Sequence, residues 1–352
     1  MAPPAAQGAS AVTARPAPDP APGTGTGTGT GSGSGSGSGA EPARPAPARA
    51  SRRRRLRRGL ASSWQLYLLA APALIFFLIF NYVPMYGVQI AFKDFIATRG
   101  ITGSPWTGFE NFERFFGSFY FWRLLRNTLA LSLYQMLLFP LPIILALALN
   151  ELRSRFFKRF SQTLTYAPHF VSTVVVVGML FAFLDPNTGL INHVLGLVGL
   201  DPIQFMQDPA WFRHLYVWSG VWQSLGWGTI IYLAALAGVN PELHQAAQVD
   251  GANRLQRIRH VNLPAIMPTV VILFILDFGS FMSVGFEKVL LMGNDLNAST
   301  ADIIQTFVYE TGLLQGQYSY AAAVGLFDSV INILLLITVN QLARKYSENS
   351  LW

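Results

Sequence analysis

The stretch SRRRRLRRGLASSWQLYLLAAPALIFFLIFNYVPMYGVQIAF, residues 51–92, decides the class of fold. Six arginines stand in its first ten residues, and residues 64–92 then contain no charged side chain. About 20 consecutive apolar residues suffice to cross the hydrocarbon core of a bilayer. The stretch therefore predicts a membrane-spanning helix whose first end is held at the anionic lipid headgroups by its arginines.

The composition extends this prediction to the whole chain. Of 352 residues, 51% are hydrophobic and only 12% are charged, whereas about a quarter of an average soluble domain is charged. This balance excludes an ordinary water-soluble globular protein. We predict an all-α integral membrane protein with six transmembrane helices. The apolar segments that predict them are 64–92, 127–150, 164–184, 213–238, 266–287 and 319–343.

The first residues differ in kind from the rest. They are rich in Pro, Ala, Gly, Ser and Thr and include the run GTGTGTGTGSGSGSGSG at 23–39. Such a segment buries too little apolar surface to offset its loss of conformational entropy. We therefore predict a disordered tail with a juxtamembrane arginine cluster over 1–58, followed by a transmembrane domain over 59–352.

The loop charges predict the orientation. With the N-terminus in the cytoplasm, 18 Lys and Arg residues lie on the cytoplasmic side and seven lie outside. Positive residues gather in cytoplasmic loops. The sequence thus predicts a multi-pass protein of the cell membrane with both termini in the cytoplasm.

Several chemistries lack the residues they need. The chain has no cysteine, no GxxxxGK[ST] loop to hold the phosphates of ATP, no GxSxG nucleophile turn, and no metal-binding spacing among its five histidines. We predict no metal site, no cofactor of its own and no catalytic centre.

The most informative loop, 239–265, lies between the fourth and fifth apolar segments. Asn240 is suited to cap a helix that starts at Pro241, and Asp250-Gly251 is suited to end it. Leu263-Pro264 then leads the chain back into the membrane. These features fit a simple surface hairpin, or a small knob that docks into another protein.

This loop resembles the EAA coupling loop of permease subunits in ATP-binding-cassette importers. The shared pattern is AAxxDGA, followed by LP eleven residues after its last alanine. The residues that carry it are Ala246, Ala247, Asp250, Gly251, Ala252, Leu263, Pro264 and Pro268. Further stretches resemble the oligosaccharide and polygalacturonate branch of these permeases: NYVPMYGVQIAFKDF (81–95), YAPHFVS (166–172), GWGTIIYLAALAG (226–238) and GFEKVLLM (285–292).

The resemblance implies the type I importer permease fold, and a subunit that moves an oligosaccharide but is not itself an enzyme. It implies as partners separate ATPase subunits that bind ATP and seat the loop, a second and different permease, and an extracytoplasmic solute-binding protein. Gln245 stands where the pattern has a glutamate. An amide keeps the size and hydrogen bonding of that side chain but loses its charge.

Candidates for the substrate path come from side chains that suit sugars. Sugar rings pack on aromatic rings and bond to amides and carboxylates, which points to Trp218, Trp222 and Gln223. Tryptophans also form ordinary interfacial belts. Polar side chains within an apolar span usually face a cavity or a partner. The residues of this kind are Asp277, Asp328 and Asn332, for which a cavity lining and a structural hydrogen bond are equal alternatives.

Two alternative functions stay open at this point. One is a permease of the same type that carries a solute other than a sugar. The other is a membrane-embedded glycosyl-processing enzyme, for which Asp277 and Asp328 would be the candidate carboxylates.

Overall fold

The computed structural model describes residues 64–346. The predicted tail and its arginine cluster lie outside the described residues. The chain divides into two compact units, Met1–Leu69 and Ala70–Trp352. Residues 64–69 begin a helix. The described part of the second unit consists of helices and loops, and its one β-bridge joins Lys93 and Trp106.

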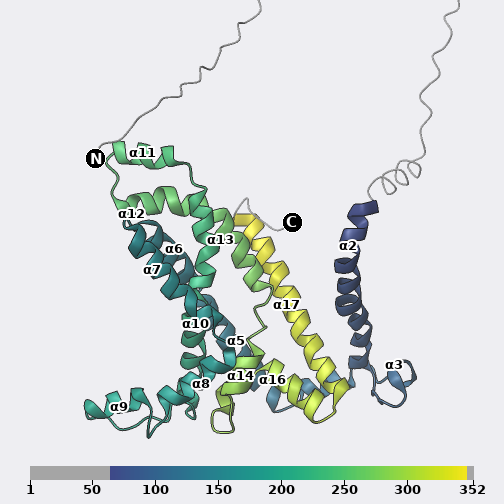
Figure 1. Ribbon diagram of the computed structural model, residues 1–352. Coiled ribbons are helices and arrows are strands. Elements are labelled where there is room, and N and C mark those ends of the chain that lie inside the picture. The colour runs from purple at the N-terminus through teal and green to yellow at the C-terminus, as the bar shows by residue number, and fades with distance from the viewer. Residues whose placement is uncertain (1–63, 347–352) are drawn as a thin grey trace, which may run out of the picture. The chain divides into compact units, whose positions relative to one another are not determined.

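All six apolar segments contain helices (Figure 1). In chain order these are α2 (Trp64–Phe77), η1 (Leu78–Tyr82) and η2 (Val83–Phe92); α5 (Tyr120–Leu137) and α6 (Pro140–Asn150); α7 (Arg155–Tyr166), η3 (Ala167–Phe170) and α8 (Thr173–Leu184); α10 (Pro209–Ala237); α12 (Arg254–Arg257), η4 (Ile258–Asn262) and α13 (Leu263–Phe278); and α17 (Tyr318–Tyr346). The connections hold α3 (Gly100–Gly103), α4 (Glu110–Phe116), α9 (Leu190–Leu197), α11 (Pro241–Val249), α14 (Phe286–Met292), α15 (Ala298–Ala301), α16 (Ile304–Tyr309) and η5 (Glu310–Leu314).

Not all of these helices are equally apolar. Among residues 64–346, four are long and apolar enough to cross a membrane: Trp64–Phe92, Tyr120–Asn150, Arg254–Phe278 and Tyr318–Lys345. A fifth is added if the bent pair Arg155–Phe170 and Thr173–Leu184 forms one span. The fourth predicted segment forms α10, whose 29 residues are long enough but include Arg213 and Gln223.

The third segment is a broken helix, which the sequence did not predict. Its two halves meet at 98°, and Val171 and Ser172 between them are extended. Pro168 lacks the N–H that would continue the first half, and the Ser172 side chain accepts a hydrogen bond from the Val175 N–H to start the second. The break therefore follows from the local sequence APHFVS.

The fifth segment ends earlier than predicted. We placed its end at residue 287, but the helix stops at Phe278 and residues 279–285 are irregular. That stretch, GSFMSVG, contains two glycines and two serines, which are weak helix formers. The predicted segment extended through this stretch because Phe281, Met282 and Val284 are apolar and keep the hydropathy of the sequence high.

The centre of the second unit is α10. It contacts α5, α6, α7, α13, α14 and α15, and its residues belong to two of the three apolar cores. Figure 1 shows α11 and α12 at one end of α10, and α9, α14 and α16 near its other end. The unit thus has two ends joined by long helices.

Close packing at Gly226 generates the first prediction. A Cβ atom there would overlap the backbone carbonyl of Thr165 and come within 2.9 Å of the Tyr166 ring. We expect Gly226→Ala to destabilise the protein by about 1–3 kcal/mol, because backbone must move to admit the methyl group. Thermal unfolding in detergent would measure this.

Gly325→Ala is the matched control, because it lies in α17 and a Cβ there would meet nothing within 4 Å. Equal unfolding temperatures for the two variants would contradict the close packing of α10 against α7.

Candidate functional site: an exposed loop helix and the cavities

The helix α11 is defined by capping residues of its own sequence, and none of its side chains belongs to the apolar cores. The Asn240 side chain accepts a hydrogen bond from the Glu242 N–H at 3.0 Å, and Pro241 occupies the first turn. No residue of α11 is buried. Leu243 and Val249 are 52% and 87% exposed. The helix therefore presents apolar side chains that the described part of the chain does not cover.

A glycine turn ends α11. Gly251 has a φ of +75°, which costs side-chain-bearing residues energy but not glycine. The Ala252 N–H donates to the Ala247 carbonyl at 2.8 Å, and the Gly251 N–H donates to the Gln248 carbonyl at 3.1 Å. This pair of bonds is the Schellman arrangement. It fixes the direction in which the chain leaves the helix.

From this turn the chain enters a continuous helical rod. Asn253 and Gln256 form reciprocal hydrogen bonds of 2.8 and 2.9 Å that cap α12, and α12 continues through η4 into α13. Arg257 Nη2 lies 3.7 Å from Glu151 Oε2. The rod is thereby attached to the end of α6.

The predicted loop residues fall into two groups in the structure. Gln245, Ala246 and Asp250 are exposed, and Ala247 and Ala252 are half-buried. Together with Gly251 these six residues occupy one short exposed element. Leu263 and Pro264 lie apart from it, in the first turn of α13.

A cavity of about 520 Å³ lies within the helix bundle, among α5, α6, α10 and α13. Its polar side chains are few: Gln135, Ser224, Tyr232 and Asp277. Most of the remaining lining is aliphatic or aromatic. A mainly apolar cavity of this size with a few polar groups is typical of small-molecule sites. Of the six predicted substrate-path residues, the structure places Asp277 here.

The two tryptophans line a different hollow. Trp218 and Trp222 lie between α8 and α10, in an almost wholly apolar hollow of about 510 Å³. The Trp218 indole N–H donates to the Tyr134 hydroxyl at 2.9 Å, which is 3.0 Å from His214 Nδ1. The structure thus separates the predicted tryptophans from Asp277.

Gln223 serves the broken third span. Its Nε2 donates to the Val171 carbonyl at 2.7 Å, in the extended part of the break. One turn further along α10, Trp227 stacks on His169 with ring centroids 4.4 Å apart. Gln223 therefore holds the break against α10, which is a positioning role.

Asp328 and Asn332 lie on α17, and Asn332 holds the irregular stretch that follows the fifth span. Asn332 Oδ1 accepts a hydrogen bond from the Met282 N–H at 2.9 Å, and Gln305 Nε2 donates to the Met282 carbonyl at 2.8 Å. Asp328 is 8% exposed, and its Oδ1 has no hydrogen-bond partner among the described residues. These residues lie away from the cavity that contains Asp277.

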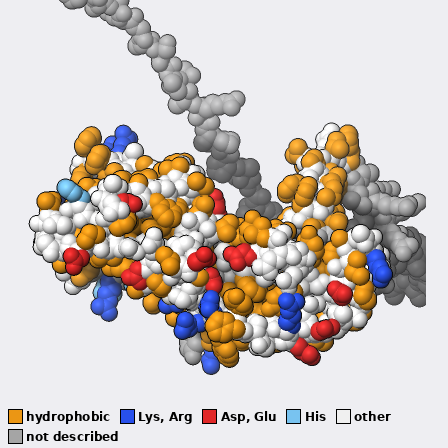
Figure 2. All heavy atoms as spheres, turned by 90° about the horizontal axis from the view of Figure 1, so that it is seen from below, with side chains coloured by type: hydrophobic (Ala, Val, Ile, Leu, Met, Phe, Trp, Pro, Cys, Tyr) orange, Lys and Arg blue, Asp and Glu red, His pale blue; other side chains and the backbone are white. Residues whose placement is uncertain are grey.

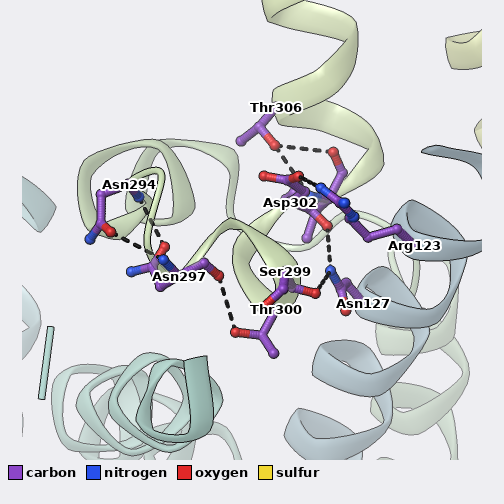
Figure 3. Close-up of polar contacts among 9 residues, drawn as sticks. Arg123, Asn127, Asn294, Asn297, Ser299, Thr300, Asp302 and Thr306 are labelled. Carbon is purple, nitrogen blue, oxygen red and sulfur yellow. Dashed lines mark hydrogen bonds and ion pairs between the residues drawn. The ribbon is translucent and has the colours of Figure 1, made fainter. Parts of the chain in front are cut away.

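A polar network that sequence reasoning missed holds the loop after α14. Figure 3 shows Arg123 and Asn127 of α5 directed at this loop. Arg123 Nη1 lies 3.2 Å from Asp302 Oδ2, and Asn127 Nδ2 donates to the Ser299 and Asp302 carbonyls. Burial raises the pKa of Asp302, although Arg123 opposes the shift. The only signal in the sequence was a set of polar residues in NDLNASTAD, 294–302.

Comparison with known proteins now gives the family. Residues 139–348 match the family described as "Binding-protein-dependent transport system inner membrane component". The chain belongs to this family.

Individual relatives cover nearly the same part of the chain. Protein LplB of Bacillus subtilis (strain 168) is 49% identical over 306 residues, which are 84% of this chain and 96% of that protein. The polygalacturonan/rhamnogalacturonan transport system permease protein YteP of the same organism is 45% identical over 299 residues, 85% of this chain and 93% of that protein.

A solved structure agrees in fold. A crystal structure of a bacterial ABC transporter involved in the import of the acidic polysaccharide alginate includes a chain with a TM-score of 0.78 and 40% identity. The match covers 83% of this chain and 99% of that one. The fold is therefore that of a type I importer permease.

Membership of this family settles two expectations. An inner membrane component of a binding-protein-dependent transport system is a multi-pass membrane protein that works with a solute-binding protein. It is a transport subunit, so the interpretation as a glycosyl-processing enzyme is wrong. The matched residues of the family include α11, its glycine turn and most of the cavity walls.

The structural role of Asn332 gives the second prediction. Asn332→Leu removes the acceptor for the Met282 N–H and leaves this buried donor unpaired, at a cost of about 1–3 kcal/mol. We expect a lower thermal unfolding temperature in detergent.

Ser329→Ala, also on α17, is the control, because the only hydrogen bond of its hydroxyl within residues 64–346 is to Gly325 of the same helix. A wild-type melting temperature for Asn332→Leu would show that this side chain is free for another role.

Proposed function

We propose that this chain is the permease subunit of an ATP-binding-cassette importer that moves an oligosaccharide across the cytoplasmic membrane. ATP is bound and hydrolysed by separate subunits, whose groove receives α11. The observation that carries the proposal is the exposure of α11: a capped, well-formed helix between two spans presents Leu243 and Val249 outward. Exposed apolar side chains on an ordered element are typical of a contact with another protein.

The connections of α11 suit a mechanical role. A movement of α11 passes through the Gly251 turn into α12, η4 and α13, and α13 supplies Leu273, Leu276 and Asp277 to the bundle cavity. The permease alternates between a state open to the cytoplasm and a state open to the outside. ATP binding shifts the populations of these two states only if it favours one of them by a few kcal/mol. The contact of α11 with the ATPase supplies that difference.

The substrate class is inferred from the relatives and from the cavity. YteP is named for polygalacturonan and rhamnogalacturonan, and the structural neighbour imports alginate. The cavity offers a carboxylate, an amide and hydroxyl groups within apolar walls, as sugar recognition requires. A non-sugar solute is the alternative, and uptake measurements distinguish the two.

The assembly and orientation complete the proposal. The positive-inside count supports a cytoplasmic location for both termini and for α11. The loops at the opposite end then face the solute-binding protein. A second, different permease completes the pathway, and Gln245 makes a hydrogen bond, not an ion pair, with the ATPase.

Co-purification tests the assembly directly. We expect the gently solubilised, C-terminally tagged chain to retain an ATPase with a phosphate-binding loop, a second six-span permease and a binding protein. Val249→Glu should weaken retention of the ATPase about tenfold, because burying one unpaired charge in a contact costs at least about 1.4 kcal/mol.

The control is Leu197→Glu on α9, a residue that is 76% exposed and lies at the other end of α10. Retention of the ATPase by Val249→Glu, or loss with both variants, would contradict the docking role of α11.

The glycine turn gives a further prediction. Gly251→Val should leave the fold intact, because a Cβ at this position meets nothing within 4 Å. A valine, however, disfavours the φ of +75° at this turn by about 1–3 kcal/mol. The altered turn then fails to transmit the movement of α11. We expect ATP hydrolysis to continue while uptake of sugar falls about tenfold or more.

Gly199→Val is the matched variant, with a φ of +80° and equally open surroundings. Uptake and ATP hydrolysis would be measured in the same proteoliposomes. Normal coupling in Gly251→Val would disprove the role of the turn.

A further inference from the structure

A further cavity, with polar and aromatic walls, lies at the end of the unit opposite α11. It has a volume of about 380 Å³ and is enclosed by the turn between α4 and α5, by α16 and η5, and by the start of α17. Figure 2 shows, from below, that acidic, basic and hydrophobic side chains lie close together on this face. We call this space the outer cavity. None of the residues predicted from the sequence lines it.

One wall of the outer cavity is aromatic. Phe119 is 79% exposed, its ring centroid lies 5.9 Å from that of Tyr120, and Tyr120 lies 5.4 Å from Phe307. Arg123 lies over the Phe119 ring at 5.0 Å. These contacts hold the rings in place while Phe119 stays open to solvent.

Another wall presents a fixed guanidinium and two amides. The Arg114 guanidinium stacks on the Tyr320 ring at 4.3 Å, and its Nη2 donates to Gln317 Oε1 at 2.8 Å. Gln317 Nε2 donates in turn to Gln315 Oε1 at 3.1 Å. Because a guanidinium has five donors, Arg114 keeps several for a ligand.

Glu310 is a further polar residue of the lining. Its side chain makes no hydrogen bond or ion pair with the described residues, whereas its backbone carbonyl accepts from the Gln315 N–H at 2.9 Å. Its neighbour Asp302 is paired with Arg123. Burial, and then the negative charges of Asp302 and Asp295, raise the pKa of Glu310. Glu310 is thus an unpaired acceptor next to a fixed donor and an aromatic platform.

We propose that the outer cavity is a subsite for one or two residues of an oligosaccharide, on the extracytoplasmic side of the permease. The aromatic platform packs on the C–H face of a sugar ring, Glu310 accepts from its hydroxyls, and Arg114 donates to hydroxyls or to a uronate carboxylate. This inference rests on the proposed function and orientation. It adds a site that the sugar occupies before it reaches the cavity among the spans.

The absence of cysteine from the chain allows a direct test. Ser118 lines the outer cavity, and Ser118→Cys is nearly isosteric. In the complete transporter, reconstituted without binding protein, a membrane-impermeant maleimide would label this thiol. Galacturonate and alginate pentasaccharides are the probes. At about four times the dissociation constant, the sugar should slow labelling about fivefold.

Matched variants locate the contact. Ser299→Cys is exposed at the same end of α10 but does not line the outer cavity, so sugar should not protect it. In the Ser118→Cys chain, Phe119→Ala or Glu310→Ala should weaken protection about two- to tenfold. Trp122→Ala and Glu113→Ala, which replace exposed residues outside the lining, should not.

The outcomes separate the two proposals. If the complete transporter with its binding protein takes up a pentasaccharide but the sugar never protects Ser118→Cys, the outer subsite is wrong and the proposed function stands. If sugar-free binding protein protects the thiol and sugar does not, the cavity is a protein contact. If neither sugar is taken up and neither protects the thiol, the oligosaccharide function and the subsite both fail.

Discussion

A polypeptide in a bilayer must satisfy its backbone hydrogen bonds from within, because hydrocarbon offers no partners. The helices of this chain are interrupted, and at two interruptions a side chain from another helix supplies the missing partner. Gln223 binds the free carbonyl of Val171, and Asn332 binds the free N–H of Met282. The breaks in the third and fifth spans therefore depend on polar residues in the fourth and sixth.

This constraint explains which predictions from the sequence were right and why others needed the structure. The apolar segments, the Asn240 cap and the turn at Gly251 are local features, so hydropathy and capping patterns reveal them. The partner of Gln223 is not local: it exists only where α10 passes the break in the third span. A polar residue within a span has the same appearance in sequence whether it serves the backbone or a substrate.

The same reasoning limits what the sequence could say about cavities. Trp218, Gln223 and Asp277 were grouped because sugars favour such side chains, yet the three point to different surroundings. The outer cavity joins Arg114 to Gln317 across 203 residues, so no pattern of spacing reveals it. Its residues looked like members of ordinary loops until the fold brought them together.

The rod of α12, η4 and α13 connects these observations into one mechanical argument. Its first end follows the exposed helix α11, its middle lines the bundle cavity with Asp277, and the chain beyond Phe278 is clamped to α17 through Asn332. A force applied to α11 cannot be absorbed at that clamp without breaking buried hydrogen bonds. Within this rod the turn η4 is π-helical, so its hydrogen bonds depart from the α-helical pattern. Under the proposed function, a movement of α11 would displace the cavity wall that carries Asp277.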